Sequence, residues 1–255
     1  MDSVVGDEES SPSVGVAGEP EAARVAAAES AVADAGGVPL VDDPATLVGA
    51  SPSFVVALGE SALLDLVRAG IDVPVLPVDA GRGVRSVPNH ALAEALQHAL
   101  GGEATTESRR CFDVTIDGED AVALFDVTLV TAEPARISEY AVRSRGDLVS
   151  QFRADGVVVS TPTGSHGYAK AAGGPTLEPG TGTGVVVPIA PFAIQADHWV
   201  VADDDLQLSV ERDEGTVSLR VDDRALREVG PAVTVSLSAG PELTLVCTAE
   251  SGARW

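Results

Sequence analysis

Ser160-Thr-Pro-Thr-Gly-Ser-His-Gly-Tyr168 follows directly on the apolar run Val157-Val-Val159. Three β-branched residues in a row favour a buried strand. Pro162 should end that strand, because proline fixes φ and removes a backbone donor. Gly164 and Gly167 allow the backbone to turn tightly. The sequence therefore predicts a strand that ends in a compact turn.

Short hydroxyl side chains are crowded around this turn, at Thr161, Thr163 and Ser165. Hydroxyls and backbone N–H groups near glycines suit the binding of a polar ligand such as a ribose or a phosphate. The alternative is an ordinary Ser/Thr turn between two strands. Residue types alone leave both interpretations open.

A longer series of segments resembles the NAD kinase family. It comprises Asp155-Gly-Val-Val-Val-Ser-Thr-Pro-Thr-Gly-Ser165, then Tyr168, Ala172-Gly-Gly-Pro175 and Val187-Pro-Ile-Ala-Pro-Phe192. In that family the motif reads DG-hydrophobic-STPTGSTAY, followed by SAGGP and a TPICP-type segment. The resemblance implies a Rossmann-like α/β domain followed by a mostly β domain, and a dinucleotide site that includes the turn.

The order of expected elements agrees with this architecture. Strands alternate with helices over residues 14–100, with helices expected over 21–35, 62–69 and 90–100, which predicts an α/β domain. Residues 101–248 contain short segments rich in Val, Leu and Thr, separated by Gly, Asp and Pro, which predicts a β-rich domain. Residues 1–13 are expected to be a disordered tail and 249–255 a C-terminal tail.

Several local features carry more specific expectations. Ser61 and Asn89 are candidate N-caps, and Asp42-Asp43-Pro44 is expected to form a turn. Segments 232–238 and 242–248 are expected to be separate strands, and short helices are expected at 168–172 and 192–196. The acidic groups Asp222-Asp223 and Asp203-Asp204-Asp205 are expected to form hairpin turns on a solvated surface.

The net charge of the chain limits which partners it can bind and indicates the salt concentration in which it works. The formal net charge is −23, and Lys170 is the only lysine. A nucleic-acid-binding role is excluded, because such proteins need a positive surface. Acid-rich, lysine-poor composition is typical of proteins from halophiles with a salty interior, where molar salt screens self-repulsion. An acidic protein from an ordinary medium is the alternative.

Other composition features indicate a cytoplasmic protein. No apolar segment approaches the roughly 20 residues that span a bilayer, and the acidic N-terminus lacks the basic start of a signal peptide. Cys111 and Cys247 have no metal-ligand spacing and are expected to be buried thiols. The histidines show no such spacing either, so no metal site is predicted.

The resemblance implies transfer of a γ-phosphoryl group from ATP, with Mg²⁺, to the adenosine 2′-hydroxyl of NAD, which gives NADP. In the family, a Gly-Gly-Asp-Gly-Thr motif supplies a phosphate loop and a carboxylate. The equivalent place here reads Gly59-Glu60-Ser61, so the loop is eroded and Glu60 is the candidate catalytic carboxylate. A plain strand-to-helix turn is the alternative.

The resemblance also marks residues that bind NAD or NADP, namely Asp126, Asp155, Thr161, Thr163, Ser165, His166, Tyr168 and Gly173. Two of them depart from the family pattern: Asp126 lies where the family has glutamate, after a phenylalanine in place of asparagine, and His166 replaces threonine. His166 is a candidate base or phosphate ligand, with a solvent-facing turn histidine as the alternative.

Two functions stay open at this point. The first is a working NAD kinase with a divergent site. The second is a catalytically inactive NAD(P)-binding homologue that acts as a sensor or as an oligomer partner. The family implies a homo-oligomer, a dimer or tetramer, in which a degenerate chain can also pair with an active paralogue. A hydrolase with Ser165 as nucleophile fits less well, because the strand-turn-helix elbow is missing.

Overall fold

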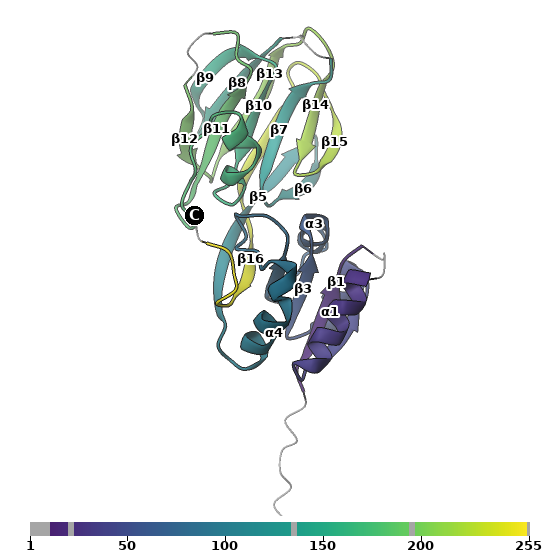
Figure 1. Ribbon diagram of the computed structural model, residues 1–255. Helices are drawn as coiled ribbons and strands as arrows, with labels where there is room; N and C mark the ends of the chain where they lie inside the picture. Colours follow the sequence, from purple (N-terminus) through teal and green to yellow (C-terminus); the bar gives the residue numbers. More distant parts are fainter. Residues whose placement is uncertain (1–10, 20–22, 134–136, 194–196, 254–255) are drawn as a thin grey trace, which may run out of the picture. The chain divides into compact units, whose positions relative to one another are not determined.

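The computed structural model describes residues 11–19, 23–133, 137–193 and 197–253. The chain divides into two compact units, shown in Figure 1. The first comprises Met1–Ala80, Ser86–Thr106 and Val246–Gly252, and the second comprises Gly81–Arg85, Glu107–Leu245 and Ala253–Trp255. Most of the predicted N-terminal tail and the core of the helix expected at 192–196 lie outside the described residues.

The first unit is built on a parallel sheet with the strand order β2-β1-β3-β4. Its strands are β1 (Ser13–Ala17), β2 (Val38–Val41), β3 (Phe54–Leu58) and β4 (Val75–Val78). The next strand after β4 is β16 (Thr234–Cys247), whose last two residues belong to this unit. β3 is buried along its whole length, as the apolar run Phe-Val-Val-Ala-Leu predicts for a central parallel strand.

Helices pack on this sheet in two pairs, α1 with α4 and α2 with α3. The helices are α1 (Ala23–Asp34), α2 (Pro44–Ala50), α3 (Glu60–Arg68), the 3₁₀ turn η1 (Asn89–Ala91) and α4 (Leu92–Leu100). Along the chain, β2 is added on one side of β1, and β3 and β4 are added on the other side. With right-handed connections, this reversal places the two helix pairs on opposite faces of the sheet. The predicted α/β architecture of this half is confirmed.

Two predicted helix caps are wrong. α3 begins at Glu60 with Gly59 at the cap, so Ser61 lies inside the helix. Asn89 is the first residue of η1, and no side chain caps that turn. In both places no side chain caps the first turn, so the residue type does not mark the position of the N-cap.

α2 is a helix that the sequence did not predict. Asp43 accepts hydrogen bonds from the backbone N–H groups of Ala45 and Thr46 at 3.0 and 3.1 Å. Pro44 occupies the first turn, where its missing N–H costs nothing. An Asp-Pro pair marks a turn or a helix start equally well, and here it starts a helix.

The second unit consists of antiparallel strands in two layers. One layer is a six-stranded sheet in the order β12-β11-β10-β7-β14-β15. The other joins β16, β13, β8 and β9, with β5 paired to β16 and β6 to β5. The bounds are β5 Thr105–Ile116, β6 Glu119–Ala123, β7 Asp126–Thr131, β8 Ser138–Ser144, β9 Asp147–Ala154, β10 Gly156–Ser160, β11 Thr183–Ile189, β12 Trp199–Ala202, β13 Leu206–Arg212, β14 Val217–Val221 and β15 Arg224–Val229.

Apolar side chains from both layers of the second unit form one core. Phe112, Leu129, Tyr140, Val157 and Leu208 are among its fully buried members. Alternation along the strands sends every second side chain into this core. The mostly β architecture predicted for this half is confirmed.

One strand prediction in this half is wrong, and one strand was not predicted. The two strands expected at 232–238 and 242–248 are one strand, β16, which runs through Gly240-Pro241. A proline removes only its own N–H, and a strand of 14 residues keeps its other hydrogen bonds. β15 was not expected, because it is polar and largely exposed at the edge of its sheet.

Cys111 and Cys247 are both buried, as predicted. Burial, with the charges of Asp222 and Asp113, raises the pKa of Cys111 to about 12. Within the described part of the chain, no helix has the length and apolar character needed to cross a bilayer.

Candidate functional site

The predicted turn at the end of β10 is present, and it leads into two short helical segments. η2 spans Gly164–His166 and α5 spans Tyr168–Ala171. α5 packs on the six-stranded sheet, where Ala169 and Val158 belong to one small apolar cluster. The turn is therefore a fixed part of the second unit.

Most of the hydroxyls in the turn hold the turn together. Thr161 donates to the carbonyl of Leu124 at 2.6 Å and accepts from the N–H of Gly164 at 3.1 Å. Ser165 donates to the carbonyl of Pro162 at 2.7 Å and accepts from the N–H of Leu177 at 2.9 Å. These two side chains fix the backbone around a site, and their hydroxyls are occupied within the protein.

Gly164 allows the turn to lie directly on the segment before β7. The N–H of Thr161 donates to the carbonyl of Phe125 at 2.9 Å. A Cβ added at Gly164 would lie 2.1 Å from that same carbonyl oxygen. No other residue type fits this contact without moving the backbone.

Asp126, which the family resemblance places in the same site, lies beside the turn. It is the first residue of β7, and it pairs in register with Ser160 at the end of β10. Its carboxylate accepts a hydrogen bond from the hydroxyl of Thr128 at 3.2 Å. The main chain around it is set by a residue that sequence reasoning missed.

That residue is Asp222, in the hairpin turn between β14 and β15. Its carboxylate accepts from the N–H groups of Leu124, Phe125 and Asp126, at 2.9, 2.7 and 3.0 Å. The predicted hairpin turn is confirmed, but the carboxylate binds backbone instead of facing solvent. Asp222 is nearly a hundred residues away along the chain, so no local sequence signal pointed to this contact.

Asp155 is separated from the turn by the length of β10. It precedes Gly156 at one end of the strand, whereas Ser160 ends the other. At about 3.3 Å per residue, five steps correspond to about 17 Å. The backbone of Asp155 binds Ile189 and Thr131. The two ends of β10 therefore present different surfaces.

The remaining predicted residues lie around η2 and α5. Tyr168 is 44% exposed, and an exposed aromatic ring offers a face for stacking. Gly173 follows α5, and its N–H donates to the carbonyl of Lys170 at 3.0 Å. Thr163 is buried and lines a small pocket.

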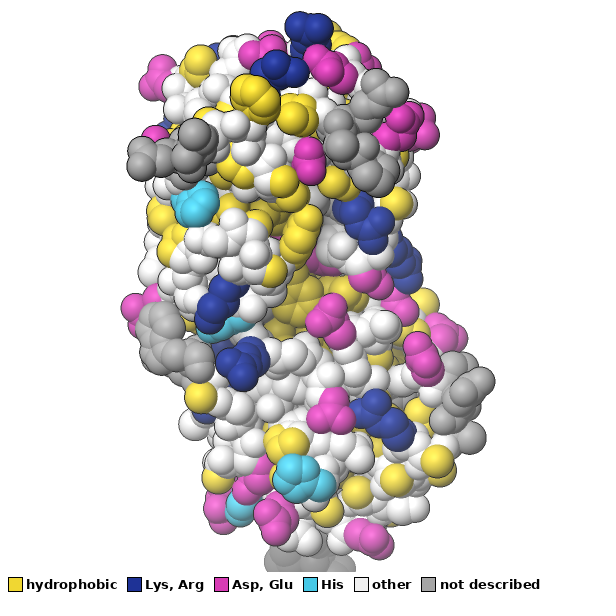
Figure 2. Space-filling view, turned by 45° about the horizontal axis from the view of Figure 1, so that its top comes forward, with side chains coloured by type: hydrophobic (Ala, Val, Ile, Leu, Met, Phe, Trp, Pro, Cys, Tyr) yellow, Lys and Arg dark blue, Asp and Glu magenta, His cyan; other side chains and the backbone are white. Residues whose placement is uncertain are grey.

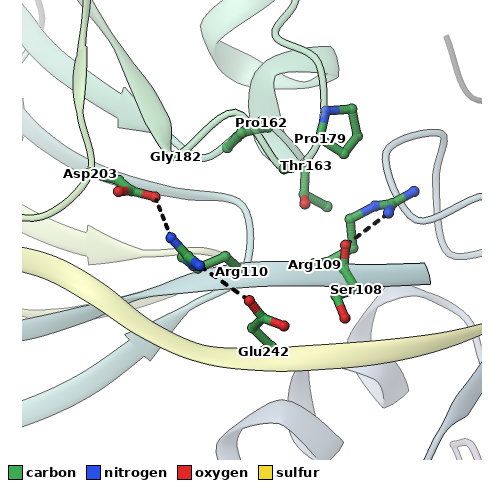
Figure 3. A pocket seen from close by; sticks show the side chains of 10 residues that line it. Ser108, Arg109, Arg110, Pro162, Thr163, Pro179, Gly182, Asp203 and Glu242 are labelled. Atoms are coloured by element: carbon green, nitrogen blue, oxygen red, sulfur yellow. Dashed lines mark hydrogen bonds and ion pairs between the residues drawn. The ribbon is translucent and has the colours of Figure 1, made fainter.

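This small pocket is shown in Figure 3. Its volume is ≈ 60 Å³, well below the several hundred Å³ of a typical nucleotide pocket. Arg110 crosses it and contacts Asp203 at 3.6 Å and Glu242 at 3.2 Å. Asp203, predicted to be solvated, is buried there. The pocket has room for water and not for a nucleotide.

His166 has an unusual environment. Its side chain is half-buried, and its Nε2 is buried without a hydrogen-bond partner among the described residues. Burial lowers the pKa of His166, and the positive charges of Lys170, Arg82 and Arg109 lower it further. Both effects favour the neutral imidazole.

Glu60 belongs to the first unit. It begins α3, directly after β3 and Gly59. It lines a pocket of ≈ 350 Å³ together with Glu19, Arg24 and Ser61. The N–H of Gly59 donates to the carbonyl of Val78, the last residue of β4, at 2.8 Å, so Gly59 is held against the neighbouring strand.

Comparisons with known proteins agree with the fold and the turn. The ATP-NAD kinase C-terminal domain family matches residues 124–247, which include the whole turn. The NAD kinase of Methanosarcina acetivorans is 34% identical over 166 residues, or 62% of this chain and 60% of that protein. The NAD kinase of Methanosarcina mazei is 31% identical over 69% of this chain and 62% of its own length. These alignments thus span about three fifths of the relatives they match.

Solved structures extend the likeness to nearly the whole fold. An NAD kinase from Archaeoglobus fulgidus in complex with ATP superposes with a TM-score of 0.75 at 21% identity, covering 93% of this chain and 94% of that one. Yeast NADH kinase complexed with NADH gives a TM-score of 0.79 at 16% identity, covering 96% and 85%. The chain belongs to the NAD kinase family.

Proposed function

We propose that this protein transfers the γ-phosphoryl group of ATP to the adenosine 2′-hydroxyl of NAD, giving NADP. The main support is the match to the family across residues 124–247, which contain the turn, Asp126 and Tyr168. In addition, the relatives from Archaeoglobus and yeast were solved with ATP and with NADH.

The dinucleotide is proposed to bind along the turn of the second unit. Asp126 and the end of β10 are adjacent by register, so a carboxylate lies next to the turn for a ribose hydroxyl. The exposed ring of Tyr168 can stack on a base. Thr161 and Ser165 act through the backbone that they hold.

Glu60 is proposed as the carboxylate that positions the reacting hydroxyl. Its place at the end of a buried strand and the start of a helix is where phosphate-binding turns occur in α/β folds. The described residues bring no three His, Cys, Asp or Glu side chains together as a metal-ligand set. This fits Mg²⁺, which is usually held by one or two carboxylates and by the phosphates of the substrate.

A second candidate function is a catalytically inactive homologue that binds NAD or NADP. The observation that favours it is Gly59-Glu60-Ser61, which has one glycine where the family has three around an aspartate. Glu and Ser keep a backbone farther from a triphosphate than glycines do. Such a chain would act as a sensor or as a partner in a mixed oligomer.

A homo-oligomer is also proposed. Asp155 and the turn lie at opposite ends of β10, so a site that uses both requires a residue from a second copy. Size-exclusion chromatography with light scattering should give a dimer or a tetramer.

One assay separates the two functions. ATP and NAD are supplied in about 1 M KCl, and NADP is measured for the wild type, Glu60→Gln and the control Glu29→Gln, an exposed glutamate on α1. We expect Glu60→Gln to lower kcat about 100-fold or more, and Glu29→Gln to change nothing.

Binding of NADP without ATP is measured in parallel by calorimetry. Binding without turnover would favour the inactive homologue. If the protein neither binds NADP nor phosphorylates NAD, both proposed functions are refuted.

A further inference from the structure

Lys170 and Arg82 stand out among the basic residues of an acidic chain. Most described arginines have a carboxylate within ion-pair distance, among them Arg24, Arg85, Arg110, Arg145 and Arg227. Across the described ranges, neither Lys170 nor Arg82 has such a partner, and both are exposed. In a chain with 39 acidic and 16 basic residues, cations kept away from carboxylates are available to a ligand.

Both residues lie near His166. Lys170 follows His166 by four residues, on α5. Arg82 lies in the short segment Gly81–Arg85, which belongs to the second unit. The charges of both act on the imidazole, together with that of Arg109.

The segment with Arg82 is held against the turn. A Cβ on Gly83 would lie 2.0 Å from the carbonyl oxygen of Thr163, so only glycine permits this contact. The Nε of Arg109 donates to the carbonyl of Gly83 at 3.0 Å. Arg109 also binds Glu107 at 2.9 Å, so its own charge is compensated. These contacts fix the backbone next to Arg82.

The Nε2 atom of His166 gives an independent sign of a ligand. Buried polar atoms nearly always have a hydrogen-bond partner, yet this one has none within the described residues. A neutral imidazole with its proton on Nε2 is a donor. In that tautomer, Nε2 is a donor without an acceptor among the described residues, and it lies near two cations that have no carboxylate partner there, which suits an anion.

We propose that His166, Lys170 and Arg82 form a binding site for a phosphoryl group. The Nε2–H donates to one phosphoryl oxygen, while the ammonium and the guanidinium balance the charge. The group belongs to a nucleotide or is free phosphate or pyrophosphate, since the same chemistry serves each. The site does not depend on the proposed kinase reaction, because an inactive chain can bind the same group.

The test measures the affinity for each anion and the pKa of the His166 imidazole. Both are measured in the full-length protein at the lowest salt concentration that keeps it folded. Pyrophosphate, inorganic phosphate and NADP are titrated by calorimetry into the wild type, Lys170→Met, Arg82→Gln and the control Arg143→Gln. Arg143 lies on β8, forms no ion pair with any residue that the structure describes, and is not among the charges that act on His166. The His166 signal is followed by NMR against pH, with and without pyrophosphate.

We expect Lys170→Met and Arg82→Gln each to weaken binding about 10-fold, while Arg143→Gln leaves it unchanged. The anion should raise the pKa of His166, because negative charge stabilises the imidazolium. Loss of affinity for all three ligands would indicate a site for free phosphate as well. Loss for NADP alone would assign the site to the nucleotide.

Other results would overturn the proposal. These are equal affinities for the wild type, Lys170→Met and Arg82→Gln, an unchanged His166 titration, or the same response to chloride as to pyrophosphate. Kinase activity is not a readout here, so failure of this site and failure of the proposed function remain distinguishable.

Discussion

At the scale of single residues, the turn after β10 depends on contacts with the backbone of the segment Leu124–Asp126. Thr161 and Gly164 lie against this segment, and Asp222 fixes the backbone of the segment itself. Gly164 leaves no space for an added atom, and removal of the Asp222 carboxylate would leave backbone N–H groups without their acceptor. The geometry of the candidate dinucleotide site is therefore sensitive to very small changes.

Replacing Gly164 by Ala should destabilise the second unit by about 3 kcal/mol, because the new Cβ collides with a fixed carbonyl. Gly230→Ala is the control in the same unit, since nothing lies within 4 Å of its added Cβ. Urea unfolding followed by tryptophan fluorescence measures both. Equal midpoints for the two variants would contradict the assigned close contact.

The sequence was a good guide to the turn and a poor guide to what surrounds it. The Ser160–Tyr168 stretch predicted the strand end and the bend, because β-branched residues, proline and glycine act locally. The role of Asp222 and the position of Arg82 depend on contacts between distant parts of the chain. The orphaned Nε2 of His166 depends on burial, which no single motif specifies.

At the scale of elements, the end of the chain is tied to α4. His98 on α4 lies 2.9 Å from a carboxylate oxygen of Glu250, in the turn after β16. This hydrogen bond raises the pKa of His98 against the effect of burial, and it lowers the pKa of Glu250. Both residues belong to the first unit.

The pair should be strongest in a defined pH window. The contribution of His98 to folding stability is complete below the ordinary histidine pKa of 6.5, and it is lost as the pH rises through the raised pKa. The contribution of Glu250 to folding stability is complete above the ordinary glutamate pKa of 4.5, and it is lost as the pH falls through the lowered pKa. Stabilisation by the pair is therefore greatest between these two values.

Glu250→Gln should bring the pKa of His98 down towards its ordinary value, as followed by NMR titration. Glu94→Gln is the matched control, because Glu94 acts on His98 only as the weakest of the nearby charges. A His98 titration that is the same in the wild type and in Glu250→Gln would refute the assigned hydrogen bond.

Errors in predicting elements have common physical causes. The Asp43-Pro44 pair starts α2, although the same pair also starts turns. β15 is polar because it lies at a sheet edge, so it shows no apolar run. A central strand was easier to predict: the apolar run Val157–Val159 indicated β10, which is buried along its length.

At the scale of the whole molecule, negative charge dominates. Acidic side chains are scattered over the face shown in Figure 2, with basic side chains among them. The net charge of −23 means that the folded chain repels itself. Exposed ion pairs such as Arg145–Asp204, at 2.7 Å, offset little of this repulsion.

Stability should therefore rise with salt, which would agree with the salty working medium expected from the composition. Between about 0.1 and 1 M KCl the Debye length falls from about 10 to 3 Å, so the midpoint of thermal unfolding should increase by several degrees. Sucrose at equal osmolality is the control, because it does not screen charge. A midpoint that is independent of KCl would argue against a halophilic protein.

β16 places a limit on how this protein can be divided for experiments. Thr234–Leu245 belongs to one unit, whereas Val246–Gly252 completes the other beside β4. A fragment cut after Thr106 would leave β4 with bare backbone groups along its edge, which favours aggregation. Joining Val246–Gly252, which comprises the last two residues of β16 and the turn after it, to Thr106 is the route to an isolated N-terminal half.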